Sequence, residues 1–315
     1  MGRSFTTTMP DADTLTTDFV SDRLTLRLVA PPMDLAPFVA GIYRLVVPPG
    51  ASVEDWLPPE EANLRTGTAK EYRAAIGDEP LRDVPSAIIS GPTDRVTHLR
   101  ISEGSFWGLG LTPTGWSQLV GVAVDSCVNR FQDARAAGVN ESLCNMLDSL
   151  RNIGDDIAGA ARLVNETLRG MLAERPPADE RILTIHRAML TDHESSVASI
   201  AARHDMNART FIRFSQKRFG FPPRILLRRQ RFLRSLGKFM LDPSMRWINS
   251  LDTAYWDQAH FIRDFRSTMG MTPGEYARRD HPIVAAAVAV THRGSGIPMQ
   301  GLYDPARPTQ SETGL

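Results

Sequence analysis

Side chains that can donate hydrogen bonds to a nucleic acid occur in two sets, about 50 residues apart, in the C-terminal half of the chain. The two sets are Arg209, Thr210 and Arg213, and Gln258, His260 and Arg263. Arginine can pair with guanine, and glutamine with adenine, through two hydrogen bonds at the base edge in the major groove. This groove accepts one α-helix, so each set would need a helix to present it. The spacing therefore predicts two nucleic-acid-reading helices.

The residues around each set follow the pattern of a helix-turn-helix. In residues 195–220, an apolar stripe at helical spacing precedes a polar break, and a second helix begins after Asn207, a good N-cap residue. In residues 244–270, Asp257 holds the same place. Both copies end in a glycine with a proline two or three residues later, which stops a helix sharply. Two repeats are too few for a solenoid and indicate a paired module.

A connecting helix and further basic residues complete this prediction. Residues 224–240 have the pattern of one helix, about 25 Å long, that could hold the two modules about one DNA turn apart. Asn207 adds a polar group at the start of the first reading helix, and the residues expected at phosphates are Lys217, Arg218 and Arg266. On the connector, we expect Arg228 to be solvated. Arg229 and Arg231 could either contact phosphates or be solvated, and the sequence does not distinguish the two.

The distribution of charge separates the chain into two halves. The whole chain has 36 basic and 36 acidic residues and no net charge. Residues 176–280 contain 18 basic and 11 acidic side chains, a net charge of +7, so residues 1–175 carry about −7. Within residues 205–240 there are ten basic residues and one acid. Such an asymmetry is typical of a nucleic-acid-binding half joined to a half with another role.

The N-terminal half is predicted to be mostly β-structure followed by helices. Residues 1–20 have no periodic pattern and are expected to form a loose arm. Short β-type segments are expected at residues 42–47, 87–89, 96–101 and 106–111. Helical spacings follow from about residue 126, and residues 175–179 form the best linker, with Asp179 as a cap for the next helix. The fold class is therefore α+β: a small β-barrel, cupin-like, with packed helices, and an all-α double helix-turn-helix domain.

These patterns divide the chain into four parts. The expected boundaries are an arm at 1–20, a sensory or dimerisation domain at 21–175, a DNA-binding domain at 176–280, and a tail with one short helix at 281–315. The two cysteines, Cys127 and Cys144, are expected to be buried thiols because two cysteines form neither a zinc site nor a disulfide framework. No apolar run is long enough to span a membrane and the N-terminus has no signal pattern, so the cytoplasm is the expected location.

The N-terminal half contains no recognisable catalytic spacing. Its polar candidates show no two-histidine metal motif, phosphate loop or nucleophile elbow; they are His98, Asp125, Cys127, Glu54, Glu60 and Glu61. We therefore expect no enzyme activity, metal or cofactor. A ligand pocket is a hypothesis, lined by Trp56, Trp107 and Trp116. The aromatic residues of the two modules recur at helical spacing and are interpreted as core rather than as a stacking platform; they are Trp247, Trp256, Phe211, Phe261 and Phe265.

Residues 195–279 resemble the AraC family of transcription regulators. The resemblance is carried by residues 209–213 in the first module and by residues 255–265 and 270–276 in the second, which are close to the family signature. It implies a DNA-binding regulator whose N-terminal domain, often a cupin-like barrel, senses a small molecule or forms dimers. Residues 106–116 resemble, more weakly, the ligand domains of such regulators.

Four residues depart from the family pattern. Asp205 and Ala254 replace the glycine of the two turns; aspartate tolerates a left-handed conformation moderately well, whereas alanine does not. Asn249 stands in place of an aliphatic residue, and Ser215 in place of phenylalanine. These departures predict a second turn of different conformation and weaker packing around Asn249 and Ser215.

The function predicted from the sequence is regulation of transcription by sequence-specific binding of double-stranded DNA. Two recognition helices would enter successive major grooves, and a small-molecule effector or dimerisation through the N-terminal domain would modulate them. RNA polymerase and a second copy of the chain are further candidate partners, and a membrane is not expected to be one. Arg209, Arg213 and Arg263 could instead be ordinary solvated charges. His260 could either contact DNA or pack within the protein. The alternative function is a protein-interaction or enzymatic sensor whose helical half is a docking surface with little DNA affinity.

Overall fold

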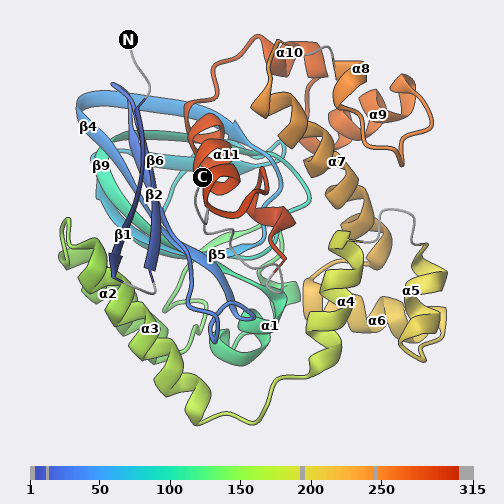
Figure 1. Cartoon of the computed structure of the whole chain (residues 1–315), viewed down its shortest axis with the longest axis horizontal. Helices are drawn as coiled ribbons and strands as arrows, with labels where there is room; N and C mark the ends of the chain where they lie inside the picture. The colour runs from blue at the N-terminus through green and yellow to red at the C-terminus, as the bar shows by residue number, and fades with distance from the viewer. Residues whose placement is uncertain (1–3, 12–13, 192–195, 245–246, 305–315) are drawn as a thin grey trace, which may run out of the picture.

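The computed structural model describes residues 4–11, 14–191, 196–244 and 247–304, and it joins one antiparallel sheet to a group of helices (Figure 1). The strands are β1 (Ser4–Asp11), β2 (Thr14–Val20), β3 (Thr25–Val29), β4 (Val39–Leu57), β5 (Ala62–Ala69), β6 (Tyr72–Ile76), β7 (Arg82–Asp83), β8 (Ala87–Ser90), β9 (Thr97–Leu111) and β10 (Phe131–Asp133). Their order is β1-β2-β3-β4-β9-β5-β8-β10, with β6 paired to β9 and β7 to β6.

The helices fall into three groups along the chain. Beside the sheet lie α1 (Pro113–Gly115), two short turns, η1 (Trp116–Val120) and η2 (Val124–Ser126), and the hairpin of α2 (Glu141–Asn152) and α3 (Ile157–Ala173). The helical region contains α4 (Glu180–Thr191), α5 (Val197–Arg203), α6 (Ala208–Phe219), α7 (Pro223–Leu241), α8 (Trp247–Ser250), α9 (Gln258–Met269) and α10 (Pro273–Ala277). The chain then returns to the sheet with α11 (Pro282–Ser295) and η3 (Gln300–Leu302).

The α+β class is confirmed, and the sheet is open rather than a closed barrel. The sheet begins at β1 and ends at β10, and in the described part of the chain these two strands do not pair with each other. Instead of closing on itself, the sheet is covered by α11, which packs against β2, β3 and β4. Figure 1 shows α11 lying against the curved sheet, with α4 to α9 beyond it at one end of the molecule.

Several strand boundaries differ from the sequence-based expectation. The loose arm is wrong for Ser4–Asp11 and Thr14–Val20, which form a hairpin that continues onto β3. Two expected strands, at 96–101 and 106–111, are one strand, β9, of 15 residues. The β4 strand runs through residues 48–50 because a register shift between Val47 and Ser52 absorbs the prolines, which a regular ladder would exclude.

The buried apolar residues form three clusters. The first joins the sheet to α2 and α3 and contains both cysteines, which are free and buried as expected. The second joins the sheet to α7, α9 and α11, so the second helix-turn-helix shares its core with the sheet. The third lies among α4, α5, α6 and the start of α7. The two modules are therefore supported differently.

The expectations for the ends of the helical region have mixed outcomes. Asp179 does cap α4, because its side chain accepts a hydrogen bond from the backbone N–H of Arg181 at 3.1 Å. The predicted short helix of the tail is α11, and residues 296–304 continue against the sheet and α7. Residues 305–315, which complete the predicted tail, and Met245, in the predicted stripe of the second module, lie outside the described residues. None of the described helices is long and apolar enough to cross a membrane.

Candidate functional site

The first module is built as the sequence predicts. The side chain of Asn207 caps α6 by accepting a hydrogen bond from the backbone N–H of Thr210 at 2.9 Å. Asp205 occupies the turn with φ of 53°, the left-handed conformation usually adopted by glycine. Gly220 ends α6 with φ of 79°. Ser215 is fully buried, and its hydroxyl donates to the carbonyl of Phe221 at 2.7 Å. The serine is therefore satisfied, although a phenylalanine would fill more space.

The second module forms the same pair of caps but a different turn. Asp257 caps α9 by accepting a hydrogen bond from the backbone N–H of His260 at 2.6 Å, and Gly270 ends it with φ of 66°. Ala254 is not among the described residues with positive φ. The turn is held instead by Asp252, whose carboxylate accepts from the backbone N–H of Ala254 at 3.0 Å and pairs with Arg234. The predicted change of turn conformation is confirmed.

The two reading helices align residue by residue in sequence. Each of α6 and α9 has 12 residues between equivalent caps, Asn207 and Asp257 at one end and Gly220 and Gly270 at the other. Arg213 and Arg263 therefore occupy the same helical position, and both are exposed. The other exposed members of the predicted DNA-binding set are Asn207, Arg209, Thr210, Lys217, Gln258 and Arg266. The structure thus presents donor side chains on both helices.

Two of the predicted DNA contacts have partners inside the molecule. His260 is half-buried, with its Nε2 3.3 Å from Arg231 Nη2, beside the Arg231 to Asp264 ion pair at 2.6 Å. Arg218 donates to the Ser117 hydroxyl at 3.2 Å and so contacts the sheet domain. Burial would lower the pKa of Arg231, but the hydrogen bond and charge of Asp264 raise it above its ordinary value. These contacts favour packing for His260.

The aromatic residues of the modules are core with one exception. Phe211, Phe261 and Phe265 are fully buried, and Trp247 stacks on Phe239 with ring centroids 3.7 Å apart. Trp256 is 93% exposed, so the expectation that it belongs to the core is wrong. Its neighbour in sequence, Tyr255, takes the buried position instead.

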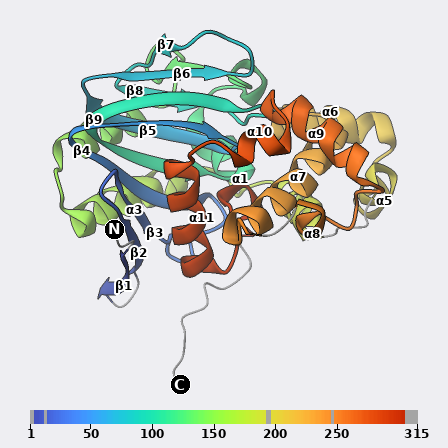
Figure 2. The ribbon, with the colours of Figure 1, turned by 90° about the horizontal axis from the view of Figure 1, so that it is seen from above.

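The connector α7 contains 19 residues, which corresponds to about 28 Å. The two modules lie at opposite ends of α7 in Figure 1, and in the view of Figure 2 both α6 and α9 lie on one side of it. Arg229 is buried and pairs with Glu61, so neither phosphate contact nor solvation describes it. Arg228 is half-buried, 3.9 Å from Asp94. The connector is therefore fixed to the sheet domain by its arginines.

The C-terminal ends of both reading helices rest on the sheet domain. The backbone N–H of Val96 donates to the carbonyl of Thr268 near the end of α9 at 2.7 Å. The end of α6 packs against η2, and Gly220 lies beside Val128 and Pro92. The N-terminal ends, with Arg209 and Gln258, are exposed. The ends expected to contact bases are thus the free ends.

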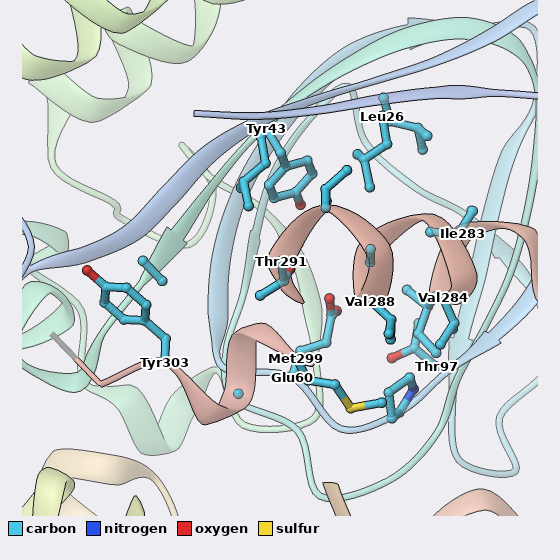
Figure 3. A pocket seen from close by; sticks show the side chains of 18 of the residues that line it. Leu26, Tyr43, Glu60, Thr97, Ile283, Val284, Val288, Thr291, Met299 and Tyr303 are labelled. Carbon is cyan, nitrogen blue, oxygen red and sulfur yellow. The ribbon is translucent and has the colours of Figure 1, made fainter. Parts of the chain in front are cut away.

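A cavity of about 180 Å³ lies between the sheet and α11. Figure 3 shows its walls, with Leu26 and Tyr43 from the sheet, Val284 and Val288 from α11, and Met299 from the segment that follows. Leu233 adds a contact from the connector α7. A ligand here would touch the sheet and the helices that hold the second module. The cavity could not be predicted from the sequence. Residues 283–290 are recognisable as an apolar run, but the sequence does not show which surface of the protein they pack against.

One end of the cavity is polar. Arg65 there pairs with Glu60 at 2.8 Å and donates to the Tyr43 hydroxyl at 2.6 Å and to the Ser90 hydroxyl at 2.9 Å. Burial raises the pKa of Tyr43, and it raises the pKa of Tyr72 to about 12, against the opposing charge of Arg65. Both phenols therefore stay protonated, and the Arg65 charge is balanced by Glu60. This end offers neutral hydrogen-bonding groups.

None of the three tryptophans predicted to bind a ligand lines this cavity. Trp107 and Trp116 are buried in the first cluster, where the Trp116 indole donates to the carbonyl of Val122 at 2.8 Å. Trp56 is half-buried between His98, at a ring distance of 4.7 Å, and Arg279, at 4.0 Å. The prediction fails because tryptophan in a sheet is more often packing material than a pocket wall.

The start of α11 is fixed to the sheet by one carboxylate. Asp55 of β4 is fully buried and accepts hydrogen bonds from the backbone N–H groups of Ile283 and Val284 at 2.8 and 2.9 Å. It also pairs with the imidazole of His281 at 2.9 Å. A carboxylate at a helix N-terminus is stabilised by the free N–H groups and by the helix dipole. Asp55 thus positions the helix that covers the cavity.

Comparison with known proteins gives one sequence match and several structural ones. Residues 200–279 match the family model of a helix-turn-helix domain. No curated protein sequence matches the chain. An apo variant of ToxT from Vibrio cholerae is 11% identical, over 72% of this chain and 96% of that one, with a TM-score of 0.41. Unsaturated fatty acid-bound ToxT from the same species is 10% identical, over 72% and 92%, with a TM-score of 0.40. The AraC-like transcriptional activator CuxR is 13% identical, over 73% and 86%, with a TM-score of 0.31.

The family match and the two capped modules define the class of protein: its C-terminal part is a helix-turn-helix DNA-binding domain. The matched residues, 200–279, are of the AraC type, as the residue pattern predicted. The domain points to regulation rather than to catalysis.

Proposed function

We propose that one chain reads two successive major grooves of double-stranded DNA, with α6 in one groove and α9 in the next. The observation that carries the proposal is the equivalence of the two helices: both are capped at the same positions, and Arg213 and Arg263 are exposed at the same helical position. Arg209, Thr210 and Gln258 would add base contacts, and Lys217 and Arg266 would contact phosphates. A connector of about 28 Å supports a separation near one turn of B-DNA.

The proposal is tested by the salt dependence of DNA binding. We would measure anisotropy with a labelled duplex, selected from a random library by the wild-type protein, at several salt concentrations. Phosphate contacts predict a steep fall of affinity with salt. Arg213→Ala and Arg263→Ala should each weaken binding, whereas Arg162→Ala, which removes an exposed arginine of α3, is the matched control and should not. Binding without a salt slope would support the docking-surface alternative.

We further propose that a small molecule in the cavity modulates this binding. An apolar cavity of about 150 Å³ is large enough to hold benzene, so the 180 Å³ here suits a molecule with about one aromatic ring. The balanced Arg65 and Glu60 pair favours a neutral molecule with one polar group over a carboxylate. Because Leu233 of α7 and the whole of one face of α11 touch the cavity, its occupation would act on the helices that hold the second module.

A matched pair of probes tests this ligand class. Indole and benzoate are similar in size, but only benzoate is charged at neutral pH. Indole should raise the melting temperature and change the affinity for the selected duplex, and benzoate should do neither. Ala287→Phe fills the cavity from α11 and should remove the indole effect. A larger effect of benzoate would reverse the assignment of ligand class.

The remaining partners belong to the same proposal. The cytoplasm stays the predicted location of this regulator. Contact with RNA polymerase and pairing with a second copy of the chain stay predictions. Sedimentation of the free and DNA-bound protein would decide the second of these.

A further inference from the structure

Trp256 is the most exposed large apolar residue among those that the structure describes, and it precedes the second reading helix. It has 93% of its surface exposed. Tryptophan is normally among the more buried residues, and an exposed indole offers a partner a large, flat apolar surface with one N–H donor.

A local packing role exists for this position, and Trp256 does not fill it. An apolar residue just before the N-cap of a helix commonly packs against the fourth helical residue and fixes the entry of the chain. In the first module, Met206 holds this position and packs in the cluster that contains Phe211. In the second, Phe261 is fully buried, and Tyr255 packs against it with ring centroids 5.3 Å apart. Trp256 is therefore not needed to hold α9.

The surroundings of Trp256 are those of a DNA-reading surface. The residue lies at the free N-terminal end of α9, one residue before the cap Asp257 and two before the exposed Gln258. Further along the helix, the exposed Arg263 and Arg266 supply positive charge. A polyanion is thus the partner that the charge of this surface favours.

The chemistry next to Gln258 selects one kind of base contact. Glutamine pairs with adenine in the major groove, and the thymine opposite that adenine presents its 5-methyl group on the same edge. An indole ring beside Gln258 is apolar and flat, and it can cover that methyl group. The neighbouring arginines of the reading helix cannot cover the methyl group in this way, because their N–H groups pair with acceptors on guanine.

We propose that Trp256 is a specificity-determining residue, whose indole packs against the 5-methyl group of a thymine in the major groove read by the second module. This inference rests on the proposed function, since it assumes that α9 enters a major groove. It adds an apolar determinant to the polar set predicted from the sequence.

The test removes the methyl group and the indole separately. The duplex selected by the wild-type protein is prepared with thymine and with uracil in the half of the site that Arg263→Ala ceases to discriminate. Trp256→Ala should bind the thymine duplex about three- to tenfold more weakly, which is the scale of one buried methyl contact. Uracil should weaken the wild type by the same factor and should not weaken Trp256→Ala further.

Controls separate the possible failures. Trp256→Ala should keep the wild-type melting temperature, because the side chain is exposed, and Met33→Ala, which removes another exposed apolar side chain, should bind as the wild type does. Equal affinity of wild type and Trp256→Ala, or an equal uracil effect in both, would overturn the inference and leave the proposed function standing. A wild type that selects no sequence and shows no salt slope would overturn both. A defect of Trp256→Ala seen only with RNA polymerase present would assign the residue to a protein contact instead.

Discussion

The two helix-turn-helix modules have the same plan but different supports. The first packs around its own cluster of α4, α5 and α6, whereas the second shares a core with the sheet and α11. The first turn depends on a left-handed Asp205, and the second on the carboxylate of Asp252. Repeated sequence patterns thus specify the reading helix, while the surrounding contacts decide with which core each module packs. The second module is the one whose core includes residues that line the cavity.

The largest expected difference between the modules follows from their cores. Phe211→Ala and Phe265→Ala each remove a fully buried ring and should cost about 3–5 kcal/mol of local stability. Only Phe265→Ala opens a hole in the core shared with the sheet, so only this variant should speed amide hydrogen exchange in β9. Equal exchange in β9 for the two variants would show that the modules are supported alike.

The next prediction concerns Glu61, which pairs with Arg229 of α7 and lies 3.8 Å from His186 of α4. Burial would raise the pKa of Glu61, but the charges of Arg229 and His186 hold it below its ordinary 4.5. The stability it contributes is present above pH 4.5 and is lost as the pH falls through the lower pKa of the folded protein.

Glu61→Gln leaves Arg229 buried without its counter-ion and should cost about 3 kcal/mol at pH 7. Denaturant unfolding at pH 7 and at pH 3.5 would measure this, and the difference between variant and wild type should shrink at the lower pH. A difference that does not change with pH would show that the Glu61 charge is not what ties α7 to the sheet domain.

A smaller effect is expected for the reading arginines. Arg213→Ala and Arg263→Ala should each lower specific affinity by about 1–3 kcal/mol, and each should relax the sequence preference in a different half of the site. Competition binding with half-site variants of the selected duplex would show this. If both variants relaxed the same half, the two helices would not be reading separate grooves.

The smallest predicted effect separates the two turns. Asp205→Gly should stabilise the protein by less than about 1 kcal/mol or leave it unchanged, because glycine adopts a positive φ without strain. Ala254→Gly should destabilise it by a similar amount, since that turn does not use a positive φ. Thermal melting would compare the two variants; a lower melting temperature for Asp205→Gly, or an unchanged one for Ala254→Gly, would contradict this difference between the turns.

The helical half could be predicted from the sequence because its signals are local. Caps such as Asn207 and Asp257 and the glycines that end α6 and α9 act within one turn of a helix, so their positions in the chain suffice. The difference in backbone conformation between the turns at Asp205 and Ala254 could be predicted for the same reason. The exposed arginines followed from helical periodicity.

The ligand side could not be predicted, because its contacts join residues far apart in the chain. Asp55 binds the start of α11 more than 200 residues later, and the cavity wall joins Leu26 of β3 to Val288 of α11. No spacing in the sequence brings these groups together. The prediction that Trp256 belongs to the core is wrong for a related reason. Helical spacing indicates which positions face a core, but Tyr255 and Trp256 are adjacent in the chain. Only the packing of the folded protein decides which of the two side chains is buried.

The most direct test of the account is a hydroxyl-radical footprint of the wild-type protein on a selected duplex, at a concentration where sedimentation shows one chain per site. Protection of the backbone that flanks two major grooves, about one helical turn or 10–10.5 base pairs apart, is predicted. Protection of a single groove, or of two grooves on opposite faces of the duplex, would contradict the claim that α6 and α9 of one chain read successive grooves.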